Sequence, residues 1–150
     1  MVKFTAEHEI FRRTVREFVE KEINPHADEW EEAGTFPAHE LFKKAAQLGL
    51  LGVEYDPAYG GGGADHWYTV ILGEELGRAD CGGVPMAITV QTDMATPALA
   101  KYGSHELKKQ YLEPALKGEL VASIAVTEPD AGSDVASIKT FARRDGDEYV

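Results

Sequence analysis

The sequence contains a single cysteine, Cys81, among its 150 residues. One cysteine cannot form an intramolecular disulfide, so a disulfide-stapled fold is excluded and a reducing compartment is favoured. No run of about 18 consecutive apolar residues is present, which argues against a membrane-spanning helix. The N-terminal residues MVKFTAEHE lack an apolar run of signal-peptide length and carry acids that transit peptides avoid. We therefore expect a cytoplasmic protein without membrane insertion.

Basic side chains are also scarce. The chain has 15 Lys and Arg against 26 Asp and Glu, a formal net charge of -11 at pH 7 and a pI near 4.8. This balance argues against nucleic acid or an anionic membrane as the partner. What is present is a chain with 43% hydrophobic residues, long enough to bury a core of its own.

The motifs of several enzyme classes are missing. The tetraglycine at 60–63 is not followed by the Gly-Lys-Ser or Gly-Lys-Thr of a phosphate loop, and Asp65 and His66 stand where a Rossmann motif needs glycine. Neither His-Glu pair, at 8–9 or 39–40, has the second histidine of a zinc peptidase. No Gly-x-Ser-x-Gly elbow is present. We expect no metal site and surface positions for the remaining histidines, which are His26, His66 and His105.

The first 118 residues show the apolar spacing of amphipathic helices. Thr5 is expected to cap the first of them, without a reciprocal capping box because His8 stands where that motif has Glu or Gln. Pro57 and the tetraglycine predict a mobile or tightly turned loop over 50–64. The predicted helices cover 5–23, 25–32, 37–48, 65–77, 84–102 with a break at Pro97, and 104–117. Asp65 is expected to cap the fourth of them and Ser104 to start the last, with helix stops at Gly49 and Gly118.

The periodicity changes after Gly118. Residues 119–127, ELVASIAVT, are rich in small and β-branched residues without helical spacing and predict a largely buried strand. Residues 137–143 alternate with a period of two, Asp145-Gly146 is a hairpin signal, and residues 148–150 begin a return strand. We therefore divide the chain into a helical domain, 1–118, and the incomplete start of a β domain, 119–150. Because such a sheet would end with unpaired edges, we interpret the chain as a fragment, the alternative being a minor surface hairpin.

A polar turn over residues 126–134 directly follows the predicted buried strand. Thr127 offers a hydroxyl and a backbone N–H, and the small residues at 131–133 would let a planar ring or a diphosphate approach the backbone. These features suit a cofactor. From these residues alone, a connecting turn with local hydrogen bonds from Ser133 and Asp134 is an equally good interpretation.

Residues 124–134, IAVTEPDAGSD, closely resemble the signature of the flavin-dependent acyl-CoA dehydrogenases. The resemblance extends along the chain in order, through GLLGV at 49–53, YGGGG at 59–63, EELG at 74–77, YGS at 102–104, QYL at 110–112, IKT at 138–140 and RDGDEY at 144–149. It implies a mainly α fold with a β start: the family's N-terminal all-α domain leading into the first strands of a β-barrel domain. A C-terminal helical bundle would follow.

The resemblance implies an oxidoreductase that uses FAD to convert an acyl-CoA thioester to its trans-2-enoyl form. A base removes the proton next to the thioester carbonyl while a hydride leaves the β carbon for flavin N5. The implied partners are electron-transferring flavoprotein and identical subunits, in a dimer or tetramer. Carried over residue by residue, the flavin-binding set is Ile124, Ala125, Val126, Thr127, Glu128, Pro129, Asp130, Ala131, Gly132 and Ser133, with Ser133 also reaching the substrate.

Thr127 stands where the family places a donor to the flavin pyrimidine, and Glu128 is not the catalytic base. That base belongs to the C-terminal bundle, so no catalytic residue is assigned and the 150 residues alone are expected to be nearly inactive. Asp130 departs from the glycine of many relatives, and Ile124 from an aromatic residue in some. The helices over 84–99, with Met86, Met94 and Pro97, would line the acyl tail, ordinary helix packing being the alternative.

Two other functions remain open. A related acyl-CoA oxidase on the same scaffold would pass electrons to oxygen and form peroxide. A non-catalytic helical subunit would instead complete a site on a second chain.

Overall fold

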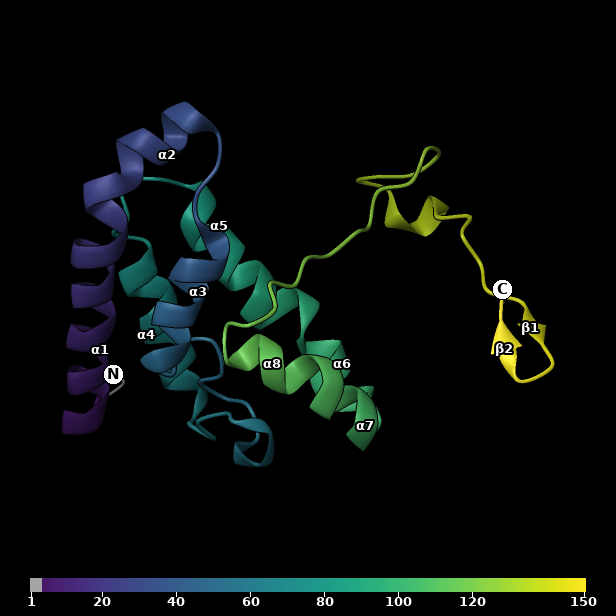
Figure 1. Ribbon diagram of the computed structural model, residues 1–150, viewed down its shortest axis with the longest axis horizontal. Helices are drawn as coiled ribbons and strands as arrows, with labels where there is room; N and C mark the ends of the chain where they lie inside the picture. Colours follow the sequence, from purple (N-terminus) through teal and green to yellow (C-terminus); the bar gives the residue numbers. More distant parts are fainter. Residues whose placement is uncertain (1–3) are drawn as a thin grey trace.

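In the computed structural model, which describes residues 4–150, helices occupy the chain up to Leu116 and an extended segment follows from residue 119 (Figure 1). We call residues 4–118 the helical body and residues 119–150 the extended segment. The two parts differ in how their backbones are hydrogen-bonded. In the helical body the backbone N–H and C=O groups of each helix bond to one another within that helix, whereas a strand in the extended segment needs a neighbouring strand as its hydrogen-bond partner.

The chain begins with α1 (Ala6–Phe18), which continues as the π-helix η1 (Val19–Ile23), the 3-10 turn η2 (Asn24–His26) and α2 (Ala27–Ala33). Thr5 caps α1 as predicted, since its hydroxyl accepts from the His8 N–H at 3.3 Å. The expectation that no capping box forms is wrong. His8 Nδ1 accepts from the Thr5 N–H at 3.1 Å, so an imidazole nitrogen takes the place of the usual carboxylate.

The second part of the helical body starts with α3 (Ala38–Gln47) and a tight loop. Gly49 follows α3 at φ +74°, the left-handed stop that the sequence predicts. The loop contains the 3-10 turn η3 (Pro57–Tyr59) and is tightly turned, because the Gly62 and Gly63 N–H groups donate back to the carbonyls of Gly52 and Tyr55 at 2.7 and 2.9 Å. A Cβ at Gly61 would lie 2.0 Å from the Tyr55 carbonyl oxygen, so only glycine fits there.

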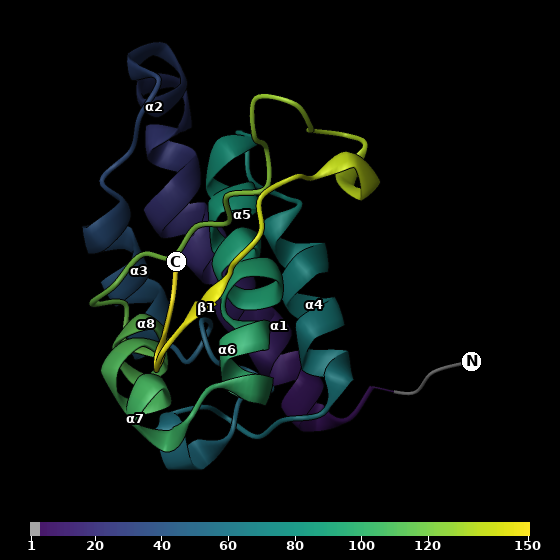
Figure 2. The same cartoon turned by 90° about the vertical axis from the view of Figure 1, so that its right-hand side faces the viewer.

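Helix α4 (His66–Leu76) is capped by Asp65, whose carboxylate accepts from the Trp67 N–H at 2.9 Å, and it packs against α1 (Figure 2). Gly118, at φ +71°, closes the last helical turn as predicted. Between α4 and Gly118 the chain forms α5 (Gly83–Thr89), the π-helix η4 (Val90–Ala95), α6 (Pro97–Tyr102), α7 (His105–Leu107), the π-helix η5 (Lys108–Leu112) and α8 (Glu113–Leu116).

One apolar cluster holds the helical body together, drawn from α1, η1, α3, the loop after α3, α4 and α5. Its buried members are Val15, Phe18, Val19, Ile23, Leu41, Phe42, Ala45, Leu50, Leu51, Val53, Leu72, Leu76, Val84 and Ile88. Beside this cluster Glu75 is only 3% exposed and accepts hydrogen bonds from Arg16 at 2.9 Å and Arg12 at 3.0 Å. These guanidinium groups, Arg16 first, hold the pKa of Glu75 below its usual value.

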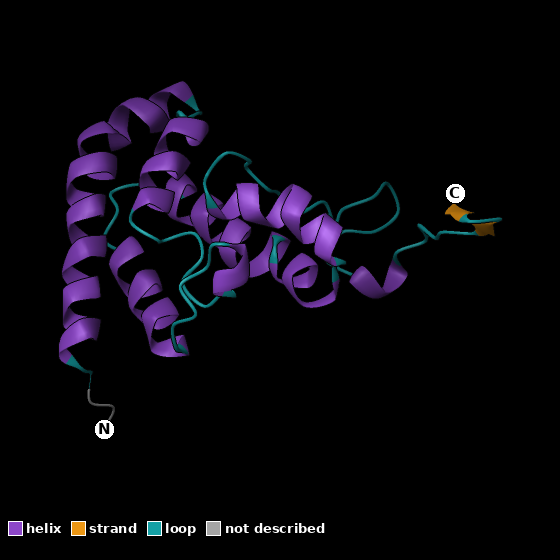
Figure 3. Ribbon diagram, turned by 60° about the horizontal axis from the view of Figure 1, so that its bottom comes forward, coloured by secondary structure: helices purple, strands orange, loops and turns teal. Residues whose placement is uncertain are grey.

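The extended segment departs from the predicted strands. Residues 119–127 are mostly exposed and form no strand, because no described strand lies beside them to pair with. Residues 137–143 are not a strand either: the 3-10 turn η6 (Val135–Ser137) is followed by chain that pairs with no strand until Arg143, which exchanges backbone hydrogen bonds with Val150. The hairpin turn is confirmed: β1 (Arg144–Asp145) pairs antiparallel with β2 (Glu148–Tyr149) across Gly146, at φ +62° (Figure 3).

The histidines expected at the surface, His26, His66 and His105, are exposed. Within residues 4–150, no three metal-ligating side chains of His, Cys, Asp or Glu come together. None of the helices described there combines the length and the apolar character needed to cross a bilayer.

Candidate functional site

The turn over residues 128–131 is closed by its own backbone. The Glu128 N–H donates to the Ala131 carbonyl at 2.8 Å, and the Ala131 N–H donates back at 3.2 Å. Pro129 and Asp130 therefore occupy the tip, while Ala131 is buried. A Cβ at Gly132 would lie 3.6 Å from the Thr127 methyl carbon, so Gly132 and Thr127 lie side by side across the base of the turn.

The acidic side chains of this turn are held by residues that follow it. The Glu128 carboxylate accepts from the backbone N–H groups of Lys139 at 2.5 Å and Thr140 at 3.0 Å, and also from the Thr140 hydroxyl. These bonds, with Lys139 first, lower the pKa of Glu128. Glu128 is therefore ionised and fully engaged, which makes it a poor proton acceptor.

Asp130 pairs with the Lys139 ammonium at 3.2 Å. Asp134 accepts from the Ser137 hydroxyl at 2.5 Å, so local bonding of the kind expected for a connecting turn is present at Asp134. No such bond is found for Ser133 among the described residues. The extra charge of Asp130 thus has a cation beside it and does not stand alone near an approaching anion.

The residues just before the turn present unused hydrogen-bond donors. No described residue accepts from the backbone N–H groups of residues 124–127, and the Thr127 hydroxyl has no partner there. The Ile124 and Val126 side chains beside them are exposed. Exposed backbone donors next to apolar side chains fit the polar edge and the flat face of an isoalloxazine, so this donor set is chemically suited to a flavin.

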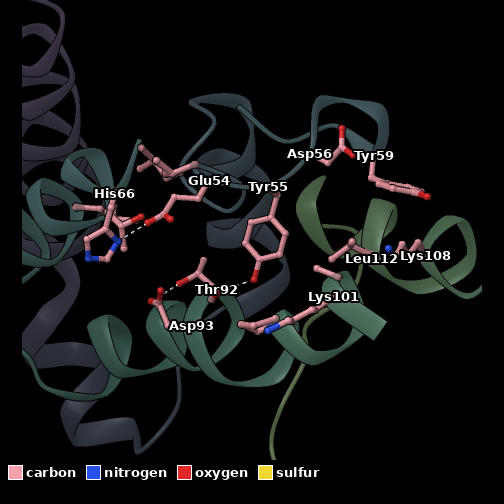
Figure 4. A pocket seen from close by; sticks show the side chains of 16 residues that line it. Glu54, Tyr55, Asp56, Tyr59, His66, Thr92, Asp93, Lys101, Lys108 and Leu112 are labelled. Atoms are coloured by element: carbon pink, nitrogen blue, oxygen red, sulfur yellow. Dashed lines mark hydrogen bonds and ion pairs between the residues drawn. The ribbon is translucent and has the colours of Figure 1, made fainter. Parts of the chain in front are cut away.

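The helical body contains a pocket of about 610 Å³, bordered by the loop at 53–59 and by α4, η4, α6 and η5 (Figure 4). Tyr55 projects into its centre, where its hydroxyl donates to the Thr92 carbonyl at 2.5 Å and lies 2.7 Å from the Thr96 hydroxyl. Burial raises the pKa of the Tyr55 hydroxyl, so it stays protonated and can donate. His66 and Glu54 pair at 2.8 Å on one side of the ring, and Lys101 lies on the other.

This pocket only partly matches the residues expected around an acyl tail. Pro97 borders it, whereas Met86 and Met94 are exposed and do not. The sequence did not lead us to predict that Tyr55 and its loop border this pocket. The one available signal was an aromatic residue inside a glycine-rich loop, where close backbone approach at Gly61 fixes the loop against the helices.

The comparisons with known proteins agree on one family. The sequence model described as "Acyl-CoA dehydrogenase, N-terminal domain" matches residues 5–119. The mitochondrial long-chain specific acyl-CoA dehydrogenase of Sus scrofa is 38% identical over 147 residues, covering 98% of this chain and 34% of that protein.

Two solved structures have the same fold. An acyl-CoA dehydrogenase from Bacillus anthracis, complexed with FAD, has a TM-score of 0.88 and 32% identity, over 99% of this chain and 25% of that one. A chain in the structure titled as the electron transferring flavoprotein of Acidaminococcus fermentans has a TM-score of 0.88 and 27% identity, over 100% of this chain and 39% of that one. The chain thus spans 25 to 39% of the length of these relatives.

Proposed function

The chain belongs to the acyl-CoA dehydrogenase family, and we propose that it is the N-terminal part of an FAD-dependent acyl-CoA dehydrogenase. In this proposal residues 1–118 form the helical domain and residues 119–150 begin the middle β domain. We call the whole polypeptide the complete subunit. The proposal is supported by the match of the family model to residues 5–119, together with the closed turn at 128–131, whose Glu128 and Asp130 carboxylates are already engaged.

The proposed reaction converts an acyl-CoA thioester to its trans-2-enoyl form, and bound FAD would accept the hydride. The N–H groups before the turn and the Thr127 hydroxyl would hold the flavin's polar edge, and Ala131 and Gly132 would let it approach the backbone. Ser133, which is exposed, would face the CoA chain. The pocket around Tyr55 would take the acyl group, with Tyr55 as a fixed donor in its wall. No residue of this chain is assigned the role of base.

The partners proposed with this function are electron-transferring flavoprotein and identical subunits in a dimer or tetramer, with a cytoplasmic location. Support for the first is the family resemblance together with the similarity to a chain in a structure titled as an electron transferring flavoprotein.

The experiment that tests the proposal is anaerobic mixing of the purified complete subunit with acyl-CoA. Bleaching of the flavin absorbance is expected, and Thr127→Ala should slow it by about 100-fold if the hydroxyl is the donor to the pyrimidine. Thr35→Ala, a change of the same kind at an exposed position on the helical body, should leave the rate unchanged. A complete subunit without flavin would refute the proposal, and peroxide formation with oxygen would identify an oxidase instead.

A further inference from the structure

Gln91 is a fully buried polar side chain that the proposed function does not use. It lies on the π-helix η4, and its relative exposure is 0%. Its Nε2 donates to the Ala115 carbonyl of α8 at 2.8 Å, and its Oε1 accepts from the Ala122 N–H at 2.8 Å. One side chain therefore ties η4, α8 and the first residues of the extended segment together.

The amide side chain satisfies both partners at once. The Ala115 carbonyl can only accept and the Ala122 N–H can only donate, so the orientation of the Gln91 amide is fixed by its surroundings. Glutamate would keep the acceptor for Ala122 but lose the donor for Ala115 and place a charge in the core. Methionine would fill a similar volume and lose both bonds.

This bond lies next to the candidate flavin segment. Ala122 is two residues before Ile124, and two residues of extended chain span at most about 7 Å. Among residues 121–127, Ala122 is the one residue whose backbone N–H donates to the helical body. The Gln91–Ala122 hydrogen bond is therefore the last described hydrogen bond to the helical body before residues 124–127.

The same residue is connected to the pocket. The Gln91 carbonyl accepts from the Thr96 N–H at 3.3 Å and from the Thr96 hydroxyl at 2.5 Å, and that hydroxyl lies 2.7 Å from the Tyr55 hydroxyl. The bond from residue 96 back to residue 91 is the wider spacing of a π-helix, a feature that is frequent at functional sites. The backbone of Gln91 is thus bonded to Thr96 beside the pocket, and its side chain is bonded to the root of the extended segment.

We infer that Gln91 is a positioning residue: it fixes the flavin-binding segment at a set distance from the acyl pocket. This inference rests on the proposed function, because the segment and the pocket have their roles only within it. Gln91 does not border the pocket. Its side chain acts through Ala122, and its backbone carbonyl accepts from Thr96 beside the pocket.

The first test measures hydrogen exchange at the Ala122 amide in the complete subunit, and it does not depend on flavin. Gln91→Met should speed this exchange by about tenfold, the ratio that corresponds to loss of one buried hydrogen bond, and Gln91→Glu should leave it slower than in Gln91→Met. Gln110→Met, at an exposed position on η5, is the matched control and should change nothing. Unchanged exchange in Gln91→Met would overturn the inference.

The second test measures the FAD dissociation constant. Gln91→Met should raise it by about tenfold. Ala122→Pro, which removes the N–H from the extended segment and leaves the core side chain in place, should raise it by a similar factor. The control is Ile71→Val, a buried change on α4 outside the pocket. Each variant is measured at the same number of degrees below its own unfolding midpoint.

An effect of Gln91→Met no larger than that of Ile71→Val would mean that Gln91 is merely a core residue, and would overturn the positioning role. If the unsubstituted complete subunit binds no FAD, the proposed function fails and the positioning role fails with it. The exchange measurement still reports in that case whether Gln91 holds Ala122, so the two failures are distinguishable.

Discussion

The helical body and the extended segment contain the same kinds of apolar residue, but almost all of the buried ones lie in the helical body. Phe42 on α3 is 0% exposed, whereas Phe141 in the extended segment is 81% exposed. Apart from Ala131, every described hydrophobic residue that is buried lies in the helical body. The difference teaches that apolar composition alone does not make a core: the helices bring their own packing partners, and the extended segment has none within residues 4–150.

The largest effect should come from substituting these two phenylalanines. Phe42→Ala should lower the free energy of unfolding by about 3–5 kcal/mol, since it opens a cavity in the core. In the 150-residue chain, Phe141→Ala should change it by less than about 0.5 kcal/mol, because the ring is exposed there. Denaturant unfolding followed by circular dichroism measures both. Similar losses for the two variants would contradict the division between the two parts.

The buried carboxylate of Glu75 should give the next largest effect. Glu75→Gln removes the charge that faces Arg12 and Arg16 and should lower the free energy of unfolding by about 3 kcal/mol. The neighbouring Glu74, half exposed at 51%, is the control, and Glu74→Gln should cost less than about 1 kcal/mol. Thermal and denaturant unfolding of both variants check this. Equal effects would mean that burial does not set the strength of these pairs.

Glycine substitutions sharpen the comparison at the level of the backbone. Gly61→Ala should cost about 1–3 kcal/mol, because the new Cβ would collide with the Tyr55 carbonyl. Gly146→Ala, in the hairpin of the extended segment, meets no atom within 4 Å and should disturb the hairpin without changing the unfolding of the helical body. Gly73→Ala, an open position inside α4, should stabilise by about 0.5–1 kcal/mol. The readout is the change in the free energy of unfolding of the helical body: a loss for Gly61→Ala, no change for Gly146→Ala and a gain for Gly73→Ala.

The smallest effect should appear in the stability of the protein at acidic pH. Glu113 lies between Lys109 at 2.8 Å and Lys117 at 2.7 Å, and these ammonium groups lower its pKa from 4.5 to about 2. A lowered pKa means that the contribution of Glu113 is present above pH 4.5 and is lost as the pH falls from 4.5 towards 2. Carboxyl NMR titration should locate this pKa, and Glu113→Gln should remove that part of the acid dependence. A Glu113 pKa at its ordinary value would contradict the pairing.

The sequence predicted the features that depend on neighbours in the chain. The Thr5, Asp65 and Ser104 caps and the stops at Gly49 and Gly118 form as expected, because each is decided within a few residues. The capping box was wrongly excluded since the rule names Glu and Gln, while the imidazole of His8 offers an equivalent acceptor. In each case the deciding contact spans no more than about one helical turn.

Features that depend on distant parts of the chain were not predictable in this way. The strand expected over 119–127 has the composition of a buried strand, but pairing requires a neighbour that the sequence pattern cannot provide. The pocket around Tyr55 and the bond between Gln91 and Ala122 join residues 31 or more positions apart, and no local periodicity signals them. The roles of residues 124–133 in flavin binding remain a prediction from family resemblance.

The measurement that most directly tests the account is amide hydrogen exchange of the complete subunit with and without FAD, resolved by residue. The account predicts that FAD slows exchange at the backbone N–H groups of residues 124–127, which have no partner among the described residues, and leaves α1 and α3 unchanged. Unaltered exchange at 124–127 in a subunit that has bound FAD would contradict it.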